Sequence, residues 1–515
     1  MATLLSSELP HSVRAAGGDA LSSDVALCDL HAHDVYAKGA TPLAVFRPTS
    51  VDQLARTVAA ATAEGIAIVP RGGGMSYTGG YLCDRPALLV DTAGLDRILD
   101  VNETDLTATV EAGVTWDQLR RHLHPLGLRA EAWGTLSGLR ATVGGGMSQN
   151  GLFWGGRDGS VVDAALSFNV VLADGTVMTT GAGFFRPYGP DLTGLFAADC
   201  GALGVKARVT LQLVRDGPAF GYGSYAFGDS ASFLAALSAI ARAGLAAESF
   251  GFDPFLQAQR MKRDSLTGDA KSLIKMMRAQ GSVVSALKEG ARVVAAGRSF
   301  LDDAVYSLHC VAEARHPETA KADIEAIDRL AREAGGRAVE NTIPKVLRSN
   351  PFPPPNSMVG PSGERWVPVH GFLPHSRLAE AWTAIGALYR EHATEMDQRG
   401  VEAGAMFAAV SPSAALIEPV FFWPDALNPL HRAAVEPAHL ARLKGFPADP
   451  AARDLVGRLR SEIVTIFGRL GATHLQIART YPLKRSHDPA AWALLEAVKR
   501  QLDPRGLMNP GSLGL

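Results

Sequence analysis

Arg479 and Tyr481 stand two positions apart near the end of the chain. In an extended strand, residues two apart project to the same face, so the sequence predicts that this guanidinium and this phenol lie side by side. Such a pair can hold a carboxylate through paired hydrogen bonds or stabilise a developing phenolate. A surface arginine next to a packed tyrosine is the alternative.

Two further side chains are candidates for proton transfer. His370 ends a short predicted strand over 366–371, and Glu418 lies within the apolar run 416–423. A carboxyl group among apolar residues is either paired or has a raised pKa, which suits a general base. A lone histidine or glutamate is more often structural, so both interpretations stay open.

A glycine-rich run over 70–80 follows the apolar stretch 66–69, which reads as a buried strand. Its five glycines give little side-chain bulk and free access to positive φ. Successive N–H groups of such a loop can converge on an anion, with a charge from Arg71 and a hydroxyl from Ser76. A flexible surface turn is the alternative, but a strand that feeds directly into the loop favours a fixed one.

A second glycine-rich run lies at 141–151, and Asp174-Gly175 predicts a tight hairpin soon after it. A further strand is expected to open at 201–205. Two glycine-rich loops, each between strands, indicate a large phosphorylated cofactor held along its length. The sequence contains no G-x-G-x-x-G and no Walker lysine motif, so a Rossmann unit is not expected.

The elements that must position these residues alternate between helix and strand. Ser50 is placed to cap a helix that ends at Gly65, and residues 1–40 are expected to be rich in loops. The proline run 351–355 predicts a loop. Later helices are predicted at 230–243, 317–334 and 377–391, and later strands at 305–311, 406–410 and 416–423.

Composition sets outer limits on what the protein can be. The chain has 515 residues, which predicts two or three domains, and its net charge of −2 gives no reason to expect nucleic acid. The four cysteines form no CxxC pair, as in proteins of reducing compartments. We find neither a signal peptide nor an apolar run long enough for a membrane span, so the expected location is the cytoplasm.

One segment is unusually basic. Between 262 and 298, eight lysines and arginines stand against three acidic residues. A basic amphipathic segment can rest on an anionic membrane or on an acidic protein partner. A solvated helix face is the more common outcome for such a run.

The order of these pieces resembles the FAD-binding domain of the flavoproteins that include vanillyl-alcohol oxidase, p-cresol methylhydroxylase, and the D-lactate and glycolate dehydrogenases. The matching pieces are 71–77, 141–151, 163–175, 201–205 and 502–511. The resemblance implies an α+β fold with a two-part FAD-binding domain over 1–215, to which 475–515 returns. It also implies an α+β substrate domain, or cap, over 216–474.

The same resemblance implies which residues contact FAD. They are Arg71, Gly72, Gly73, Gly74, Met75, Ser76, Tyr77, Thr135, Thr142, Gly144, Gly145, Ser148, Asn150, Val205 and Asn509. Many relatives carry, after the glycines of the first loop, a histidine that bonds covalently to the flavin. This chain has Met75 there, which is no nucleophile for that bond, so non-covalent FAD is expected.

Enzymes of this kind remove a hydride from a C–H bond while a base takes the neighbouring hydroxyl proton. The catalytic candidates are Arg479, Tyr481, Glu418 and His370. Phenol-oxidising relatives use a tyrosine–arginine pair in the corresponding region, whereas hydroxy-acid dehydrogenases usually carry a histidine-rich metal motif that this sequence lacks. No metal is therefore expected.

The expected small-molecule substrate is an aromatic alcohol or alkylphenol, and the aromatic run 421–423 favours a ring. A D-2-hydroxy acid is the alternative, and a non-catalytic flavin-binding protein is the alternative of another class. The electron acceptor (oxygen, a quinone or a cytochrome) and a homodimer stay open.

Overall fold

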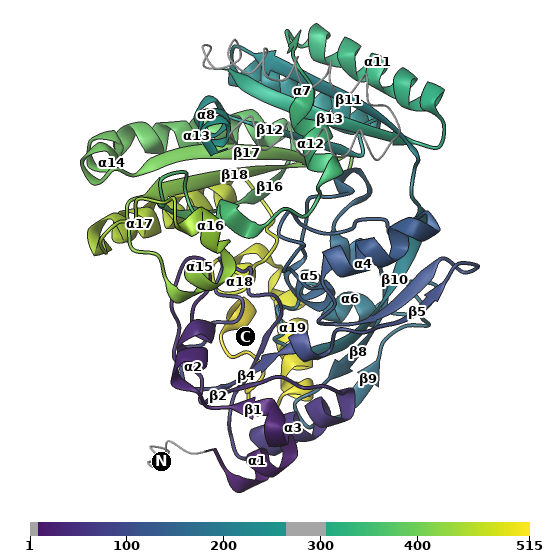
Figure 1. Cartoon of the computed structure of the whole chain (residues 1–515), viewed down its shortest axis with the longest axis vertical. Coiled ribbons are helices and arrows are strands. Elements are labelled where there is room, and N and C mark those ends of the chain that lie inside the picture. Colours follow the sequence, from purple (N-terminus) through teal and green to yellow (C-terminus); the bar gives the residue numbers. More distant parts are fainter. Residues whose placement is uncertain (1–8, 264–304) are drawn as a thin grey trace.

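The computed structural model describes residues 9–263 and 305–515, arranged as a lower part with two sheets and an upper part with one (Figure 1). The first sheet has the strand order β1-β2-β4-β3. These strands are β1 (Leu21–Ser22), β2 (Ala44–Phe46), β3 (Ile68–Arg71) and β4 (Leu88–Asp91). β4 pairs in parallel with β2 and β3. Parallel neighbours need crossover connections, and helix α3 (Val51–Ala63), whose first turn is capped by Ser50, lies between β2 and β3 in the chain.

The second sheet is antiparallel and follows the order β5-β6-β10-β8-β9, with β7 paired to β10. Its strands are β5 (Ile98–Asn102), β6 (Thr107–Glu111), β7 (Leu128–Ala130), β8 (Ala165–Val171), β9 (Val177–Thr179) and β10 (Val205–Arg215). β8 and β9 form the hairpin that Asp174-Gly175 predicts, with Val171 opposite Val177. Helix α4 (Trp116–Leu123) packs its apolar side into the core on this sheet.

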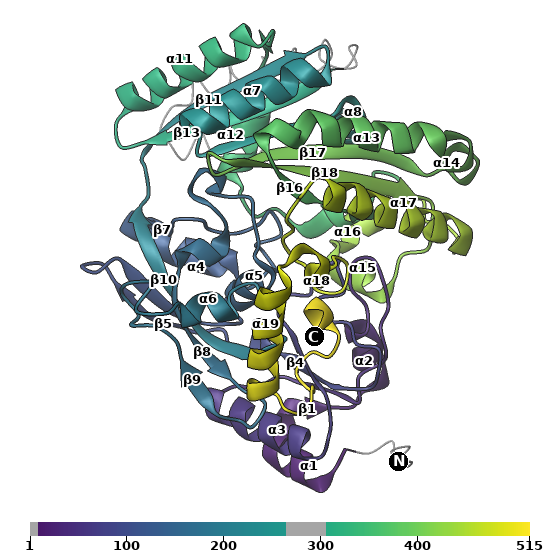
Figure 2. The ribbon, with the colours of Figure 1, turned by 180° about the vertical axis from the view of Figure 1, so that it is seen from behind.

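The upper part is built on an eight-stranded antiparallel sheet of order β14-β11-β13-β12-β17-β18-β15, with β16 paired to β18. Its strands are β11 (Ala219–Phe227), β12 (Glu248–Phe252), β13 (Tyr306–Ala314), β14 (Arg337–Ala338), β15 (Arg365–Pro368), β16 (Gly371–Pro374), β17 (Glu402–Val410) and β18 (Ala414–Trp423). Helices α7 (Ser230–Ala243), α11 (Pro317–Glu333), α13 (Leu378–Glu391) and α17 (Pro450–Arg469) share one large core with this sheet (Figure 2). The mixed architecture confirms the predicted α+β class.

Predicted and observed elements agree best where the pattern is long. The helix expected over 230–243 has those bounds, and the one expected over 317–334 is one residue shorter. The expectation of loops over 1–40 is wrong, because α1 (His11–Gly17) and α2 (Val25–His31) lie there. Both are only seven residues long, too short for a clear helical period.

The last residues return to the first sheet. After α19 (Pro489–Leu502), the carbonyl of Leu507 accepts a hydrogen bond from Ile68 N, and Asn509 N donates to the carbonyl of Ile68. All four cysteines are buried and free. The basic segment over 262–298 falls almost wholly outside the described residues, beyond the end of α8 (Pro254–Arg263). None of the helices in the described part combines the length and apolar character that crossing a bilayer requires.

Candidate active site

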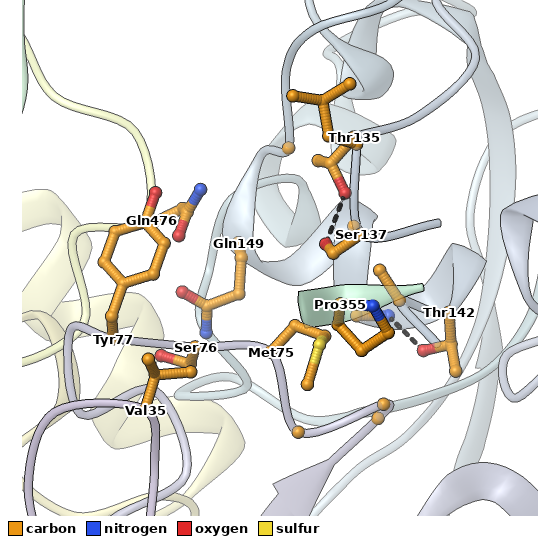
Figure 3. A pocket seen from close by; sticks show the side chains of 18 of the residues that line it. Val35, Met75, Ser76, Tyr77, Thr135, Ser137, Thr142, Gln149, Pro355 and Gln476 are labelled. Carbon is orange, nitrogen blue, oxygen red and sulfur yellow. Dashed lines mark hydrogen bonds between the residues drawn. The ribbon is translucent and has the colours of Figure 1, made fainter. Parts of the chain in front are cut away.

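A cavity of about 530 Å³ is lined by residues of the lower sheets and of the upper sheet (Figure 3). Its lower wall holds both glycine-rich runs, and its upper wall holds residues of β17, β18 and the proline-rich segment. The cavity therefore joins the two regions that the sequence singles out for cofactor and substrate.

In the first glycine-rich run, three glycines allow the backbone to pack against its neighbours without side chains. A Cβ at Gly72 would overlap the hydroxyl of Thr142, and one at Gly73 would overlap the carbonyl oxygen of Arg140. Gly74 has a φ of +73°, a left-handed conformation that favours glycine. The loop is thus fixed and closely packed, and the flexible-turn alternative is wrong.

The second glycine-rich run is a helix rather than the expected loop. α5 (Val143–Gln149) begins at Thr142, whose hydroxyl accepts a hydrogen bond from Gly145 N at 3.1 Å. A Cβ at Gly146 would crowd the ring of Trp116, so the glycines here serve close helix packing. Glycine-rich composition masked the helix because glycine is a poor helix former.

Two buried cations face the cavity from the lower part. Arg71 is 7% exposed, its guanidinium lies 5.2 Å from the centre of the Tyr81 ring, and its Nε has no hydrogen-bond partner among the residues that the structure describes. Lys206 bonds through Nζ to Asp199 and, at 3.0 Å, to the hydroxyl of Ser148. A buried arginine with an unused donor, next to the glycine backbone of 72–74, fits the diphosphate of FAD.

The upper end of the cavity is aromatic. The rings of Tyr77 and Trp366 meet edge to face at 5.8 Å, and Met406, Phe422 and Glu418 also line this end. Burial raises the pKa of Tyr77 well above its usual range, and the nearby Glu418 carboxylate adds to the rise. The Tyr77 hydroxyl is therefore protonated at neutral pH and lies close to Gln476 (Figure 3).

Comparison with known proteins agrees with this geometry. Residues 42–181 match the family of FAD binding domains, and residues 439–513 match the C-terminal domain of FAD linked oxidases. A structure of p-cresol methylhydroxylase with substrate bound shares the fold, with a TM-score of 0.71 at 18% identity, over 98% of this chain and 96% of that one. Residues 42–181 therefore form an FAD-binding domain, and the chain shares the fold of p-cresol methylhydroxylase.

Two further proteins are similar to this chain in sequence or in fold. The glycolate oxidase subunit GlcD of Bacillus subtilis is 31% identical over 188 residues, which cover 35% of this chain and 40% of that protein. An alkyldihydroxyacetonephosphate synthase structure matches with a TM-score of 0.69 at 15% identity, over 96% of this chain and 83% of that one. The match thus spans only two fifths of the length of the glycolate oxidase subunit. The two domain matches confirm the prediction that the cofactor is FAD.

Most residues predicted to contact FAD lie on the cavity wall. Those that line it are Arg71, Gly72, Gly73, Gly74, Met75, Ser76, Tyr77, Thr135, Thr142, Gly144, Gly145, Ser148 and Val205. Asn150 and Asn509 do not line it: Asn150 ends α5 with a φ of 52°, and the Asn509 amide donates to the carbonyls of Gly80 and Cys200 at 3.0 and 2.6 Å.

The strand that was to align Arg479 with Tyr481 is absent, because residues 478–480 form a turn. Arg479 donates to the carbonyls of Gly79 and Pro510, both at 2.6 Å, and to the Asn509 side chain at 2.9 Å. It therefore fastens the end of the chain to the first glycine-rich segment, and it does not line the cavity.

Tyr481 and His370 form a buried pair away from the cavity wall. The Tyr481 hydroxyl accepts from His370 N at 2.8 Å and lies 3.2 Å from Nδ1, while Nε2 lies 2.9 Å from the carbonyl of Leu475. Burial lowers the pKa of His370 to about 3, so the imidazole is neutral, with its proton on Nε2 facing that carbonyl. His474 stacks on Tyr481 at 4.1 Å.

Of the four catalytic candidates, only Glu418 lines the cavity. No sequence pattern marks Trp366 or Lys206 as functional, since a lone aromatic or lysine in a strand is usually structural. Gln476 could have been found, because it lies within the stretch that holds Arg479. In the described ranges, no three His, Cys, Asp or Glu side chains gather as a metal site would require.

Proposed function

We propose that this chain is an FAD-dependent oxidoreductase that oxidises an aromatic alcohol or alkylphenol. One observation carries the proposal: a single cavity joins the FAD-binding wall to an aromatic wall that includes the carboxylate of Glu418. Bound FAD would supply the acceptor for a hydride. The fold of p-cresol methylhydroxylase, solved with substrate bound, supports this direction.

Binding and orientation of the cofactor fall to the lower wall. Arg71 and the N–H groups of residues 72–76 would hold the diphosphate, and Lys206 with Ser148 would add a second polar contact. The domain boundaries expected at 215/216 and 474/475 are part of this proposal.

Proton transfer falls to the upper wall. The Glu418 carboxylate would take the hydroxyl proton of the substrate as its C–H bond breaks. Tyr77, which keeps its proton because burial raises its pKa, would donate a hydrogen bond to the substrate oxygen. Trp366, Met406 and Phe422 would exclude water and face a ring.

A D-2-hydroxy acid is the second candidate, and the identity with the glycolate oxidase subunit supports it. Its carboxylate would need a cation beside the reacting carbon. Among the described lining residues, Arg71 and Lys206 are the cations, and both belong to the FAD-binding wall. The aromatic substrate is therefore preferred.

An anaerobic screen tests the proposal. Purified holoenzyme would be mixed with para-alkylphenols, aryl alcohols and D-2-hydroxy acids, while flavin absorbance near 450 nm is followed. Bleaching by the aromatic compounds supports the proposal, and bleaching by hydroxy acids alone favours the second candidate. If no compound bleaches the flavin, both substrate classes are excluded, and the result favours the alternative of a non-catalytic flavin-binding protein.

Attachment of FAD is tested by acid precipitation. Met75 lines the cavity where relatives have a histidine, and burial raises the pKa of the Cys200 thiol, also on the wall, to about 12. A thiol that stays protonated is a poor nucleophile. We expect a colourless pellet and a yellow supernatant. A yellow pellet would show a covalent bond.

A further inference from the structure

A segment of the upper part forms one side of the FAD cavity. We call residues 342–358 the strap; it comprises helix α12 (Thr342–Ser349), the proline-rich run and a short 3₁₀ turn (Pro355–Met358). The strap runs between β14 and β15 of the upper sheet. Its cavity-facing members are Val346, Leu347, Asn350, Pro353, Pro354, Pro355, Asn356, Ser357 and Met358.

The middle of the strap is embedded in the FAD-binding domain. The indole Nε1 of Trp154 donates to the carbonyl of Pro351 at 3.0 Å. Phe352 is 3% exposed, meets the ring of Trp133 edge to face at 5.6 Å, and belongs to the core of the antiparallel lower sheet. The strap thus belongs to the cap but packs into the lower part, so its position determines the shape of the cofactor cavity.

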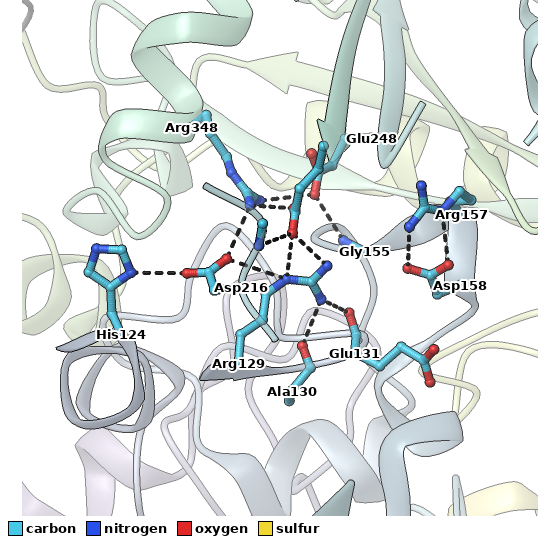
Figure 4. A network of polar contacts seen from close by, with 12 residues as sticks. His124, Arg129, Ala130, Glu131, Gly155, Arg157, Asp158, Asp216, Glu248 and Arg348 are labelled. Carbon is cyan, nitrogen blue, oxygen red and sulfur yellow. Dashed lines mark hydrogen bonds and ion pairs between the residues drawn. The ribbon is translucent and has the colours of Figure 1, made fainter. Parts of the chain in front are cut away.

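Arg348 lies at the point where the strap passes from one part to the other (Figure 4). Its Nη1 donates to Glu248 at 3.2 Å and its Nη2 to Glu313 at 2.6 Å. The guanidinium also lies 4.9 Å from the ring centre of Trp133 and 4.8 Å from that of Phe220. Its side chain is 8% exposed.

The carboxylates that Arg348 bonds are themselves tied to the lower part. Glu248 accepts from Gly155 N at 3.2 Å, and Glu313 accepts from Arg129 Nη2 at 2.9 Å. Arg129 donates further to the carbonyls of Ala130 and Glu131, and bonds no strap residue through a hydrogen bond in the described structure. Two arginines therefore share Glu313, but only Arg348 belongs to the strap.

We propose that Arg348 is a positioning residue that fixes the strap as a wall of the FAD cavity. A planar guanidinium can bond two carboxylates in different directions while stacking on an aromatic ring, which an ammonium group cannot do. Removal of Arg348 leaves Glu248 buried without its arginine, so the network must rearrange or admit water. Because Val346 and Leu347 precede Arg348 on the same short helix, that rearrangement moves the cavity wall. The inference goes beyond the proposed reaction and depends only on this cavity holding FAD.

The test compares R348M with R129M, a control that removes a buried arginine from the same network and the same carboxylate. Two quantities are measured for each holoprotein: the FAD dissociation constant, and the quenching of bound-flavin fluorescence by iodide. R348M is expected to weaken FAD binding about tenfold or more and to raise iodide quenching, whereas R129M changes both by about threefold or less. R348K keeps the positive charge but loses the planar guanidinium. Its FAD affinity and iodide quenching should therefore stay close to those of R348M.

Equal changes in R348M and R129M would overturn the proposal, since the network would then only join the two parts. Wild-type FAD affinity and quenching in R348M would also overturn it. If R348M does not fold, E248Q makes the same test, because Glu248 bonds Arg348 and Glu313 still holds Arg129. Here too, FAD affinity equal to wild type would refute the role of the network.

Discussion

On its FAD-binding side the cavity is walled in part by the glycine backbone of two runs, whereas on the cap side it is walled by the side chains of Trp366, Met406 and Phe422. Most glycines of the first wall lie in two short stretches of sequence, 72–80 and 144–151. The second is assembled from the strap, β15, β17 and β18, which are scattered over many residues of chain.

Because the two walls differ in composition, they suit different ligand groups. A wall of N–H groups suits an anionic diphosphate and tolerates no added Cβ, so its composition is narrowly restricted. A wall of apolar side chains suits a ring and can be re-formed by other residues of similar volume. We expect cofactor binding to be fragile toward substitution and substrate choice to be adjustable.

The sharpest test of the glycine wall is Gly73→Ala. The new Cβ would overlap the carbonyl oxygen of Arg140, so the loop must shift and FAD binding should fall by about 100-fold or more. Fluorescence titration of the apoprotein with FAD measures this. Gly228→Ala is the control, because a Cβ at Gly228 meets no heavy atom of the described residues within 4 Å. Unchanged affinity in Gly73→Ala would mean that the backbone wall is not the cofactor site.

The side-chain wall is tested at its carboxylate. Glu418→Gln should lower the anaerobic rate of flavin reduction by about 10²-fold to 10³-fold and leave FAD affinity close to wild type, because a base is lost but the backbone wall is kept. Glu436→Gln is the matched control, since Glu436 also lines the cavity but hydrogen-bonds Asn356 of the strap. Equal rates in Glu418→Gln and wild type would remove Glu418 from the chemistry.

The buried pair of His370 and Tyr481 should make the stability of the fold sensitive to acid. Burial lowers the pKa of His370 from its ordinary 6.5 to about 3, so the unfolded chain binds this proton more readily. Its contribution to stability is present above pH 6.5 and is lost as the pH falls toward 3, by about 1.4 kcal/mol per pH unit. His370→Asn should therefore flatten the decline of unfolding free energy between pH 6 and about 4, measured by urea titration.

The control for that experiment is His487→Asn, on an exposed histidine. His431 also has a pKa lowered to about 3 by burial, so His370→Asn removes only part of the acid sensitivity. A decline as steep as in wild type would show that His370 does not bind its proton in the way described.

The smallest effect is expected on substrate preference in Arg479→Met. Arg479 donates hydrogen bonds to the carbonyls of Gly79 and Pro510 and contacts no part of the aromatic wall in the described structure. Loss of these bonds in Arg479→Met should lower the melting temperature by a few degrees. The relative rates of flavin reduction by different substrates should stay within about twofold of wild type. A selective loss with phenols or with hydroxy acids would place Arg479 at the substrate after all.

The sequence was most informative where local chemistry decides the structure. The glycine loop at 72–74 and the hairpin at Asp174-Gly175 could be predicted because these residue types favour particular backbone conformations at their own positions. The long helices of the cap were equally clear from their period.

The side-chain wall could not be found in this way. Trp366 meets Tyr77 across almost three hundred residues of chain, and no local pattern marks such a pair. The strand expected to align Arg479 with Tyr481 does not form, because Gln476 and Ala478 have positive φ and turn the chain. Side-chain direction there is set by buried partners, His370 and Asn509.

The return of the chain end to the first sheet has a consequence for folding. Asn509 donates to the carbonyl of Gly80, a partner 429 residues earlier. During synthesis at roughly 5–20 residues per second, the glycine-rich segment therefore waits tens of seconds for the residues that complete its support. We expect the nascent FAD-binding domain to remain incomplete over that interval, with its apolar edge at Ile68 open to chaperones, and FAD to enter only after the last turn has docked.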